Sequence, residues 1–321
     1  MRPALKPGLR PVWRNRDTVQ IGIDPRRAVA LTGMSGAVGL LGLLDGSRDR
    51  AQLLAAAGEL GIGAGAVDRV LSLLAAGGVL HDFPASTYQS VPGAVRARLA
   101  PELATAALAY GDGDGGARTL VRRQAACVRV RGGSQVGLRV AGLLADAGVG
   151  LVVSAGPKLA LTQHAGPAHH HGHGDHPRKV PDLVILTDIP RRDVADALTR
   201  DKIPHLAAAA GEAIGVVGPL VLPGQSACLR CLDLARAERD PAWPLILAQL
   251  TGPGADPPAC DAVLATTVAA QAAAQALGFI DRGRAAAVTN GTLELVLPGW
   301  QWKRRSWQRH TRCGCGSSIP R

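Results

Sequence analysis

The stretch Ala126-Cys-Val-Arg-Val-Arg131, followed by Gly132-Gly-Ser-Gln-Val-Gly137, decides the fold. The first segment predicts a strand, and the glycine-rich turn leads into apolar residues at helical spacing over 138–147. A second apolar strand is expected at 149–153. Strand, glycine turn, helix and strand make a βαβ unit, which predicts an α/β domain with a Rossmann-like, doubly wound sheet.

This glycine turn is also a candidate phosphate site, because it precedes a helix whose N-terminal amides and dipole attract anions. A standard phosphate-binding turn has a middle glycine where this chain has Ser134, which needs a less permissive backbone. Gly132, Ser134 and Gly137 are therefore candidate nucleotide-binding residues, and a packing role for the turn is the alternative. Residues 181–188 predict a buried parallel strand that ends at Asp188, where such sheets bind ligands or where the carboxylate caps a turn.

Two cysteine pairs, Cys228-Leu-Arg-Cys231 and Cys313-Gly-Cys315, supply four thiolates, which is the ligand number of a tetrahedral zinc site. About 80 residues separate the pairs, so a metal would close a long loop and fix the C-terminal residues to the domain. A closed four-sulfur site leaves no position for substrate, so the expected role is structural. A disulfide or unpaired thiols are the alternatives, because the one-residue spacing of the second pair departs from the usual pattern.

The other cysteines and a histidine tract are weaker candidates. Cys260 precedes an apolar helix predicted at 262–277, and a helix N-terminus lowers a thiol pKa, so Cys260 is a candidate nucleophile with a buried inert thiol as the alternative. Cys127 lies in the first strand and is expected in the core. The tract His169-His-His-Gly-His-Gly-Asp-His176 has affinity for transition metals and predicts a disordered loop.

The chain is basic, with a formal net charge of +11 over 321 residues. The basic residues gather near both ends, at Arg2, Lys6, Arg10, Arg14 and Arg16 and at Lys303, Arg304, Arg305, Arg309 and Arg312. Such clusters suit an acidic partner or phosphate, or they form a solvated surface.

No segment has the pattern of a signal peptide, since residues 1–16 are basic and lack an apolar core, and the protein is expected in the cytoplasm. The longest apolar run, 262–277, contains Thr and Gln and falls short of the ~20 residues of a membrane span. Six cysteines without an export signal favour metal ligands or reduced thiols over a disulfide framework.

Residues 18–82 predict a small winged-helix domain. A hairpin over 18–31 precedes three helices, at 37–44, from Asp49 as N-cap to about residue 60, and at 66–76. The expected organisation is a basic tail (1–17), the winged-helix domain (18–82), a linker interrupted by a helix or two (83–125) and the α/β domain with its zinc site (126–321).

The segments Leu44-Asp-Gly-Ser-Arg-Asp49 and Gly77-Gly-Val-Leu-His-Asp82 make the winged-helix region resemble the PqqD-like recognition elements. These elements bind the leader peptides of ribosomally made, modified peptide natural products. The resemblance implies that an extended leader peptide adds to the edge of the hairpin and packs on the third helix. A DNA-binding winged helix is disfavoured, because Arg69 is the one basic residue over 66–76. A purely structural accessory domain is the other alternative.

The α/β domain resembles the ThiF/MoeB/HesA family, the bacterial relatives of ubiquitin-activating enzymes. The resemblance rests on the turn at 132–137, on Ala147-Gly-Val-Gly150, on Gly218-Pro-Leu-Val-Leu-Pro-Gly224 leading into the first cysteine pair, and on the second pair. It implies a doubly wound sheet, ATP and magnesium binding, adenylation of the C-terminal carboxylate of a peptide or small carrier protein, a structural zinc ion and, often, a homodimer.

Departures from this family favour its non-adenylating members. The acidic residue expected after the second strand would align near 155–157 and is missing, and so is the following Arg-Gln pair. Lys158 is the remaining candidate phosphate contact, although it lacks the planar fork of arginine. The leading prediction is a ThiF-like protein with a degenerate adenylation site, which binds a precursor peptide and presents it to a cyclodehydratase-type enzyme. An active ATP-dependent adenylyltransferase and a basic DNA-binding regulator are the alternatives.

Overall fold

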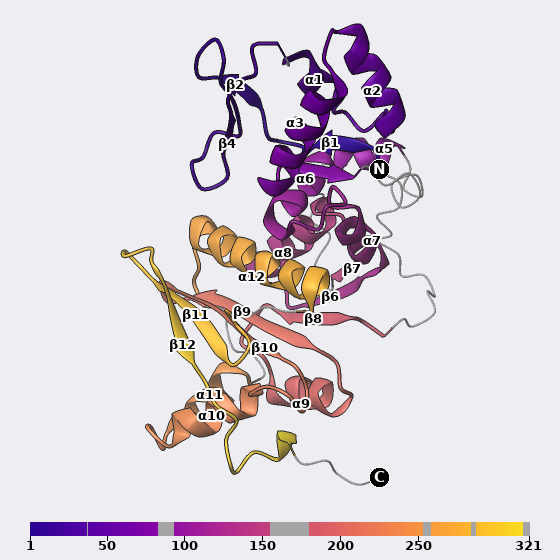
Figure 1. Ribbon diagram of the computed structural model, residues 1–321. Helices are drawn as coiled ribbons and strands as arrows, with labels where there is room; N and C mark the ends of the chain where they lie inside the picture. Colours follow the sequence, from indigo (N-terminus) through magenta and orange to yellow (C-terminus); the bar gives the residue numbers. More distant parts are fainter. Residues whose placement is uncertain (37, 83–92, 155–179, 253–257, 284–286, 317–321) are drawn as a thin grey trace. The chain divides into compact units, whose positions relative to one another are not determined.

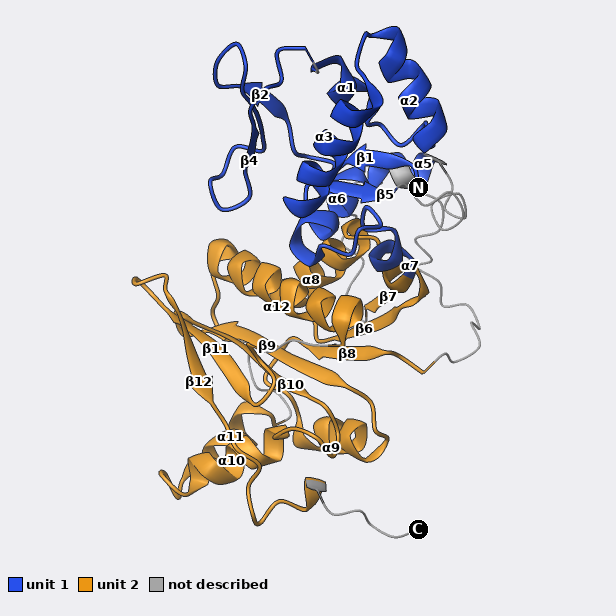
Figure 2. Ribbon diagram, viewed as in Figure 1, with its two compact units in different colours: residues 1–121 blue, residues 122–321 orange. Residues whose placement is uncertain are grey.

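The computed structural model describes the chain except for residues 37, 83–92, 155–179, 253–257, 284–286 and 317–321. It consists of two compact units, Met1–Val121 and Arg122–Arg321 (Figure 2). Each unit has its own hydrophobic clusters, so each is described by itself.

The described residues of unit 1 form two small antiparallel sheets. One pairs β1 (Pro3–Leu5) with β5 (Leu80–Asp82), and the other has the strand order β2 (Pro11–Trp13), β3 (Val19–Ile21), β4 (Val29–Leu31). The pairing of β3 with β4 confirms the hairpin predicted over 18–31. The structure differs from the expected tail at 1–17, because β1 and β2 are paired strands there.

Three helices of unit 1 follow the predicted pattern: α1 (Val38–Leu43), α2 (Arg50–Glu59) and α3 (Ala64–Ala76). Asp49 is the N-cap of α2 and forms a capping box with Gln52, since each side chain accepts a hydrogen bond from the other residue's amide. Buried side chains of all three helices and of β3 and β4 form one core. These helices and strands therefore share one hydrophobic core.

Residues 93–121 are more regular than the predicted linker. They contain α5 (Gly93–Arg98), α6 (Ala100–Tyr110) and the first part of α7 (Ala117–Ala125). Leu99, Leu103 and Leu120 are buried against one another. Pro101 lies in the first turn of α6, where proline is tolerated, and Gly111 is the left-handed C-cap of the same helix.

Seven strands are present in the part of unit 2 that the structure describes: β6 (Cys127–Arg131), β7 (Leu151–Ser154), β8 (Leu183–Leu186), β9 (His205–Gly211), β10 (Ile214–Val221), β11 (Gly291–Val296) and β12 (Trp302–Ser306). They form one sheet in the order β12-β11-β10-β9-β8-β6-β7 (Figure 1). From β7 to β9 neighbouring strands are parallel, and from β9 to β12 they are antiparallel. The sheet is therefore mixed, with the predicted βαβ unit in its parallel part.

Helices cover both faces of this sheet. On one face, α8 (Gln135–Asp146) and α12 (Ala262–Arg282) pack on alternate residues of the strands, such as Val128 and Ile185. On the other face, α9 (Arg192–Arg200) and the start of α10 (Leu229–Ala237) pack on the intervening residues, such as Val184 and Leu186. Strands buried on both faces are typical of doubly wound folds, and the predicted fold class is confirmed.

The apolar stretch at 215–224 begins within an extended strand of the sheet and does not fold back on itself. It forms the single strand β10, which pairs with β9 through the turn residues Glu212 and Ala213, both at positive φ. The stretch leaves the sheet after Val221 and leads into α10. The short helix α11 (Trp243–Leu250) follows α10.

Helix α12 is longer than the predicted 262–277 and, at 21 residues, is long and apolar enough to cross a membrane by length and composition. Its residues Leu264, Val268 and Ala272 are, however, fully or almost fully buried in the core of unit 2. Such burial is what the core helix of an α/β sheet requires, and this role explains the composition of α12.

Candidate functional site

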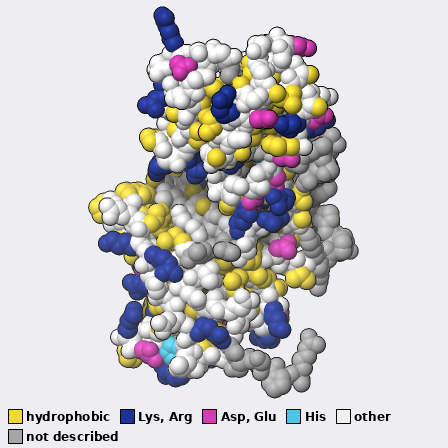
Figure 3. All heavy atoms as spheres, viewed as in Figure 1, with side chains coloured by type: hydrophobic (Ala, Val, Ile, Leu, Met, Phe, Trp, Pro, Cys, Tyr) yellow, Lys and Arg dark blue, Asp and Glu magenta, His cyan; other side chains and the backbone are white. Residues whose placement is uncertain are grey.

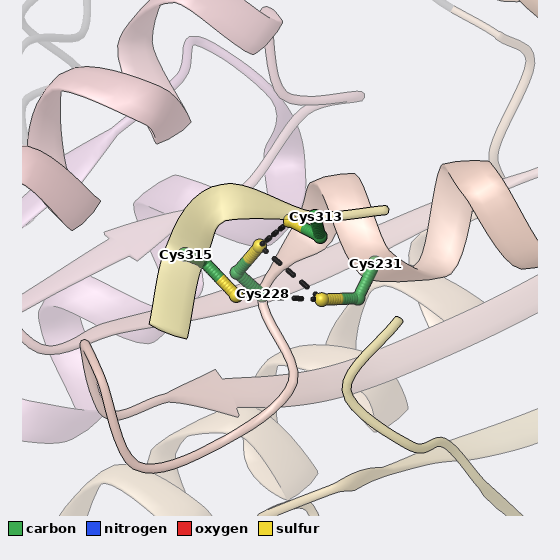
Figure 4. Close-up of side chains that lie close together, drawn as sticks. All are labelled: Cys228, Cys231, Cys313 and Cys315. Atoms are coloured by element: carbon green, nitrogen blue, oxygen red, sulfur yellow. Dashed lines mark hydrogen bonds between the residues drawn. The ribbon is translucent and has the colours of Figure 1, made fainter. Parts of the chain in front are cut away.

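The four cysteines of the two predicted pairs meet in unit 2. Their sulfur atoms all lie within 4.8 Å of one another. Cys228 and Cys231 are buried at the start of α10, and Cys313 and Cys315 come from the C-terminal segment that passes over that helix (Figure 4). Residues at i and i+3 share one face of a helix, so the first pair presents both sulfurs to the second.

Spacings between the sulfurs agree with a tetrahedral metal site. The Sγ–Sγ distances are 3.7 Å for Cys228–Cys231, 3.6 Å for Cys228–Cys313 and 3.5 Å for Cys231–Cys315. Four sulfurs at the usual zinc–sulfur distance are about 3.8 Å apart, whereas the sulfurs of a disulfide are about 2.05 Å apart. The cysteines are free, and the donor set fits a closed zinc site that leaves no position for substrate.

The cysteines of the cluster differ in pKa, because hydrogen bonds and burial act differently on each thiol. The hydrogen bond donated by Cys228 lowers the pKa of Cys231 to about 4, and donating it raises the pKa of Cys228. Burial raises the pKa of Cys313 to about 11. Because thiolates are the metal-binding species, binding of a zinc ion would release the protons that Cys228 and Cys313 hold.

Asn290, a residue outside both cysteine pairs, fixes the main chain next to the cysteines. Asn290 accepts a hydrogen bond from the Ala227 amide through Oδ1, at 2.7 Å, and another from the Trp307 amide through its carbonyl oxygen. The Trp307 ring is 6% exposed and packs with Cys228 and Cys231. These contacts hold the start of α10, the end of β12 and the C-terminal segment together.

The glycine turn begins where β6 ends and caps α8. Ser134 is the N-cap of α8, where its Oγ accepts a hydrogen bond from the Gly137 amide and donates one to the Thr187 carbonyl oxygen at 2.8 Å. The Gly133 amide donates to Oδ2 of Asp188 at 3.1 Å. Four predicted residues, Gly132, Ser134, Gly137 and Asp188, are therefore adjacent.

Close packing explains why two of these positions are glycine. A Cβ atom at Gly132 would lie 2.5 Å from Oγ1 of Thr187 and 2.7 Å from Oδ2 of Asp188. A Cβ atom at Gly137 would lie 2.5 Å from the same Thr187 oxygen. Gly132 also has a φ of +127°, which side chains disfavour. The residues present fit the packing role that was the alternative to nucleotide binding, and Asp188 occupies one amide that a phosphate would use.

The thiol of Cys260 is not activated as its position suggested. Asp261 is the N-cap of α12 and accepts hydrogen bonds from the amides of Val263 and Leu264, so its carboxylate occupies the helix N-terminus. Burial and the negative charge of Asp261 raise the pKa of Cys260, while Arg139 acts in the opposite direction. The expected lowering of this pKa is therefore wrong, and a nucleophilic role for Cys260 stays a prediction without that support.

Comparison with known proteins extends this description of the fold. No protein-family model matches the chain, and the search of curated proteins found no match. Among solved structures, the chain is similar to a heterocyclase in complex with substrate and cofactor, at 14% identity and a TM-score of 0.66, over 98% of this chain and 39% of that one. It is similar to the heterocyclase TruD at 16% identity and a TM-score of 0.65, over 98% and 43%.

The chain is also similar to E. coli MccB, in a crystal structure with AMPCPP and MccA, at 15% identity and a TM-score of 0.63. That similarity covers 99% of this chain and 100% of MccB. The chain thus spans less than half of the length of each heterocyclase and the full length of MccB. At these identities the shared property is the fold, an MccB-like arrangement of small N-terminal strands followed by the α/β sheet.

Two predicted features lie outside the described residues: Lys158 and the tract from His169 to His176. Conversely, the sequence analysis missed Asn290, although the Asn-Gly dipeptide at 290–291 marks a turn that admits its positive φ of 52°. It also missed the stacking of Arg236, whose guanidinium carbon is 4.9 Å from the Trp243 ring centre and 5.4 Å from that of Trp307.

Proposed function

We propose that the chain binds an extended precursor peptide through unit 1 and acts in the maturation of a ribosomally made peptide. In this proposal it presents the peptide to a separate enzyme of the cyclodehydratase type, in the cytoplasm. The nucleotide site of unit 2 is degenerate, and a zinc ion at the four cysteines has a structural role. The single observation that carries the proposal is the free edge of β4 beside α3.

This edge has the properties of a strand-addition site. β4 is the last strand in the order β2-β3-β4, so one row of its backbone groups has no partner strand within the part of unit 1 that the structure describes. A Cβ atom at Gly77, directly after α3, would lie 2.6 Å from a methyl carbon of Val29 in β4. Leu73 lies one turn earlier on the same side of the helix and is 48% exposed. An extended peptide added to β4 would therefore meet an apolar side chain on α3.

The solved structures with this fold support the choice of ligand class. One MccB structure is described as a complex with N-formylated MccA, and the heterocyclase structure as a complex with substrate and cofactor. For this chain, a peptide ligand is an extension of that similarity, because the shared property is the fold.

The test is direct binding of fluorescein-labelled synthetic peptides that cover the short reading frames adjacent to the gene, measured by fluorescence anisotropy. Leu73→Glu is expected to weaken binding at least tenfold, because it places a charge against the peptide. Leu60→Glu is the control, since Leu60 is 52% exposed at the C-cap of α2, a helix that Figure 1 draws apart from β4 within the same unit. Equal affinities of both variants and the unchanged protein would reject the β4 edge as the binding site.

An active adenylyltransferase is the second candidate, and one observation favours it. Asp188 lies at the carboxyl end of β8 against the turn that caps α8, so a carboxylate for magnesium and amides for phosphate lie close together. Calorimetry with ATP and magnesium on zinc-replete protein tests this candidate. Binding that disappears in Gly137→Asp, together with magnesium-dependent pyrophosphate exchange, would support adenylation, and no binding by folded protein would exclude it.

DNA binding by the winged helix is not favoured. Over Ala64–Ala76, helix α3 carries one basic residue, Arg69, and one acidic residue, Asp68, so its side chains have no net positive charge. A recognition helix that neutralises several phosphates needs an excess of Lys or Arg.

A further inference from the structure

Strand β12 is the edge of the seven-stranded sheet in unit 2, and its outer side is free of any neighbouring strand among the described residues. It pairs with β11 alone, from Gly291↔Ser306 to Leu295↔Trp302. In Figure 1 it borders the sheet on the side away from β7. An edge strand of this kind carries a row of unpaired N–H and C=O groups.

The register identifies the residues that carry this row. Trp307 donates its amide to the carbonyl oxygen of Asn290, so residue 307 faces β11. Backbone groups of an antiparallel strand alternate in direction, which turns those of Lys303 and Arg305 toward β11 as well. The groups of Trp302, Arg304 and Ser306 therefore point outward, where a further strand would bond them.

The strand is held in place from its inner side. The Arg304 side chain donates to the carbonyl oxygen of Ala287 at 2.9 Å and to Ser306 Oγ at 2.6 Å. The Trp302 ring packs on the core of unit 2, and the Trp307 ring, just after the strand, is buried. A partner strand would therefore meet an ordered edge and would not have to order it first.

Positive charge is concentrated along this edge. Lys303, Arg304, Arg305 and Arg309 are exposed, and the sequence from residue 297 to the C-terminus contains no Asp or Glu. Arg305 has Glu294 as an ion-pair partner at 3.3 Å, whereas Lys303, Arg304 and Arg309 form no ion pair within the described part of the chain. Figure 3 shows Lys and Arg side chains along the left margin of unit 2, on the side where Figure 1 draws β12.

The positive charge of β12 favours an acidic partner segment over a second copy of the same strand. Two copies of β12 paired antiparallel about Arg304 would oppose Lys303 to Arg305 and bring like charges together, which disfavours self-pairing. An extended segment with Asp or Glu at alternate positions would instead place its carboxylates beside Lys303 and Arg305 while its backbone bonds Trp302, Arg304 and Ser306.

We propose that β12 is a docking edge for an acidic, extended segment of a partner protein, which adds to the sheet as an eighth strand. The site lies in unit 2 and does not depend on peptide binding to β4 in unit 1. A result that overturns one of the two proposals would therefore leave the other unaffected.

The probe is an eight-residue peptide of alternating Glu and Thr or Val, labelled with fluorescein, and its counterpart has Lys in place of Glu. Binding to the full chain is measured by fluorescence anisotropy at low and at moderate salt. The acidic peptide is expected to bind at least tenfold more tightly than the basic one, with an affinity that falls as salt increases. Lys303→Glu is expected to weaken its binding at least fivefold, whereas Lys202→Glu, an exposed charge change outside β12, leaves the affinity within twofold.

Substitutions at Ser306 separate strand addition from simple charge attraction. Ser306→Pro removes an outward N–H at an edge, where proline is tolerated, and is expected to weaken binding at least fivefold. Ser306→Ala removes the side-chain hydroxyl, as Ser306→Pro also does, but keeps the backbone N–H. Its affinity for the acidic peptide is therefore expected to stay within twofold of that of the unchanged protein. Equal binding of Ser306→Pro and Ser306→Ala would overturn the proposal, as would equal binding of the acidic and basic peptides. Displacement of the acidic peptide by a tenfold lower concentration of single-stranded DNA would also overturn it, in favour of a nucleic-acid surface.

Discussion

Arg123 and Asp281 form a buried bidentate ion pair in unit 2. Nε and one terminal nitrogen of the guanidinium donate to the two carboxylate oxygens, at 2.9 and 2.7 Å, and the side chains are 8% and 0% exposed. Arg123 also donates to the carbonyl oxygen of Ala147 at the end of α8. The pair thereby ties the end of α7 and the end of α8 to helix α12.

Breaking this pair leaves one buried charge without its partner. Asp281→Ala is expected to lower the free energy of unfolding by about 3–5 kcal/mol, whereas replacing both residues, as Arg123→Met with Asp281→Leu, is expected to be much less destabilising. Urea denaturation followed by tryptophan fluorescence measures both, because four of the five tryptophans lie in unit 2. If the double variant were less stable than Asp281→Ala, the buried charge of Arg123 could not be the cause of the lower free energy of unfolding.

The four-cysteine cluster predicts a bound metal that orders the C-terminal segment. The purified chain is expected to contain about one zinc ion per molecule. The variants Cys231→Ser and Cys313→Ser are expected to lose this ion. Loss of the metal is expected to expose Trp307, which packs on the cysteines, and to shift its fluorescence to longer wavelength. Elemental analysis and fluorescence check both effects, and Cys127→Ser, which changes a buried cysteine of β6 outside the cluster, should keep the metal.

Because Gly137 lies close to Thr187, we expect a substitution at Thr187 to offset the loss of stability caused by Gly137→Ala. Gly137→Ala would place a methyl group 2.5 Å from Thr187 Oγ1 and is expected to destabilise unit 2 by about 1–3 kcal/mol. Thr187→Ala removes that oxygen, so the double variant should be more stable than the sum of the two single effects. A thermal-unfolding double-mutant cycle measures the coupling, and strictly additive effects would rule out the contact as the cause.

His205 predicts a loss of stability in acid. The ring is 0% exposed, Nδ1 lies 3.0 Å from the carbonyl oxygen of Ile203, and Nε2 has no partner among the described residues. Burial lowers the pKa of His205, so below the ordinary histidine pKa the unfolded chain binds a proton that the folded chain does not. The free energy of unfolding should therefore fall as pH drops below about 6.5, by at most about 1.4 kcal/mol per pH unit from this group.

His205→Phe is expected to reduce this dependence between pH 7 and pH 5. The tryptophan signal of unit 2 distinguishes it from the effect of His81, whose pKa burial also lowers but which lies in unit 1. An unchanged pH profile in His205→Phe would assign the acid sensitivity to another group.

Elements whose signals are local could be predicted from the sequence. The capping box of Asp49 and Gln52 marks the start of α2 within four residues, and the strand, glycine turn and helix around Ser134 form one contiguous motif. The cysteine set was predictable for a similar reason, since residue type and spacing limit the possible chemistry.

Features that depend on distant residues could not be predicted in this way. Strands β1 and β5 are three residues each and are stabilised by pairing Pro3 with Asp82, across most of unit 1. The hydrogen bond from Gly133 to Asp188 depends on how two loops meet at the end of the sheet. The raised pKa of Cys260 depends on which neighbouring side chain occupies the helix N-terminus, and that side chain is the carboxylate of Asp261.

The order of the cysteines along the chain also constrains how the protein is made. Cys228 and Cys231 leave the ribosome well before Cys313 and Cys315, after every strand from β6 to β10 has been synthesised. A metal held by all four cysteines would therefore bind only after the strands of the parallel core have been synthesised. Metal binding at the complete cluster would thus be a late step of folding, and a chain interrupted before residue 313 would hold Cys228 and Cys231 without the second pair of ligands.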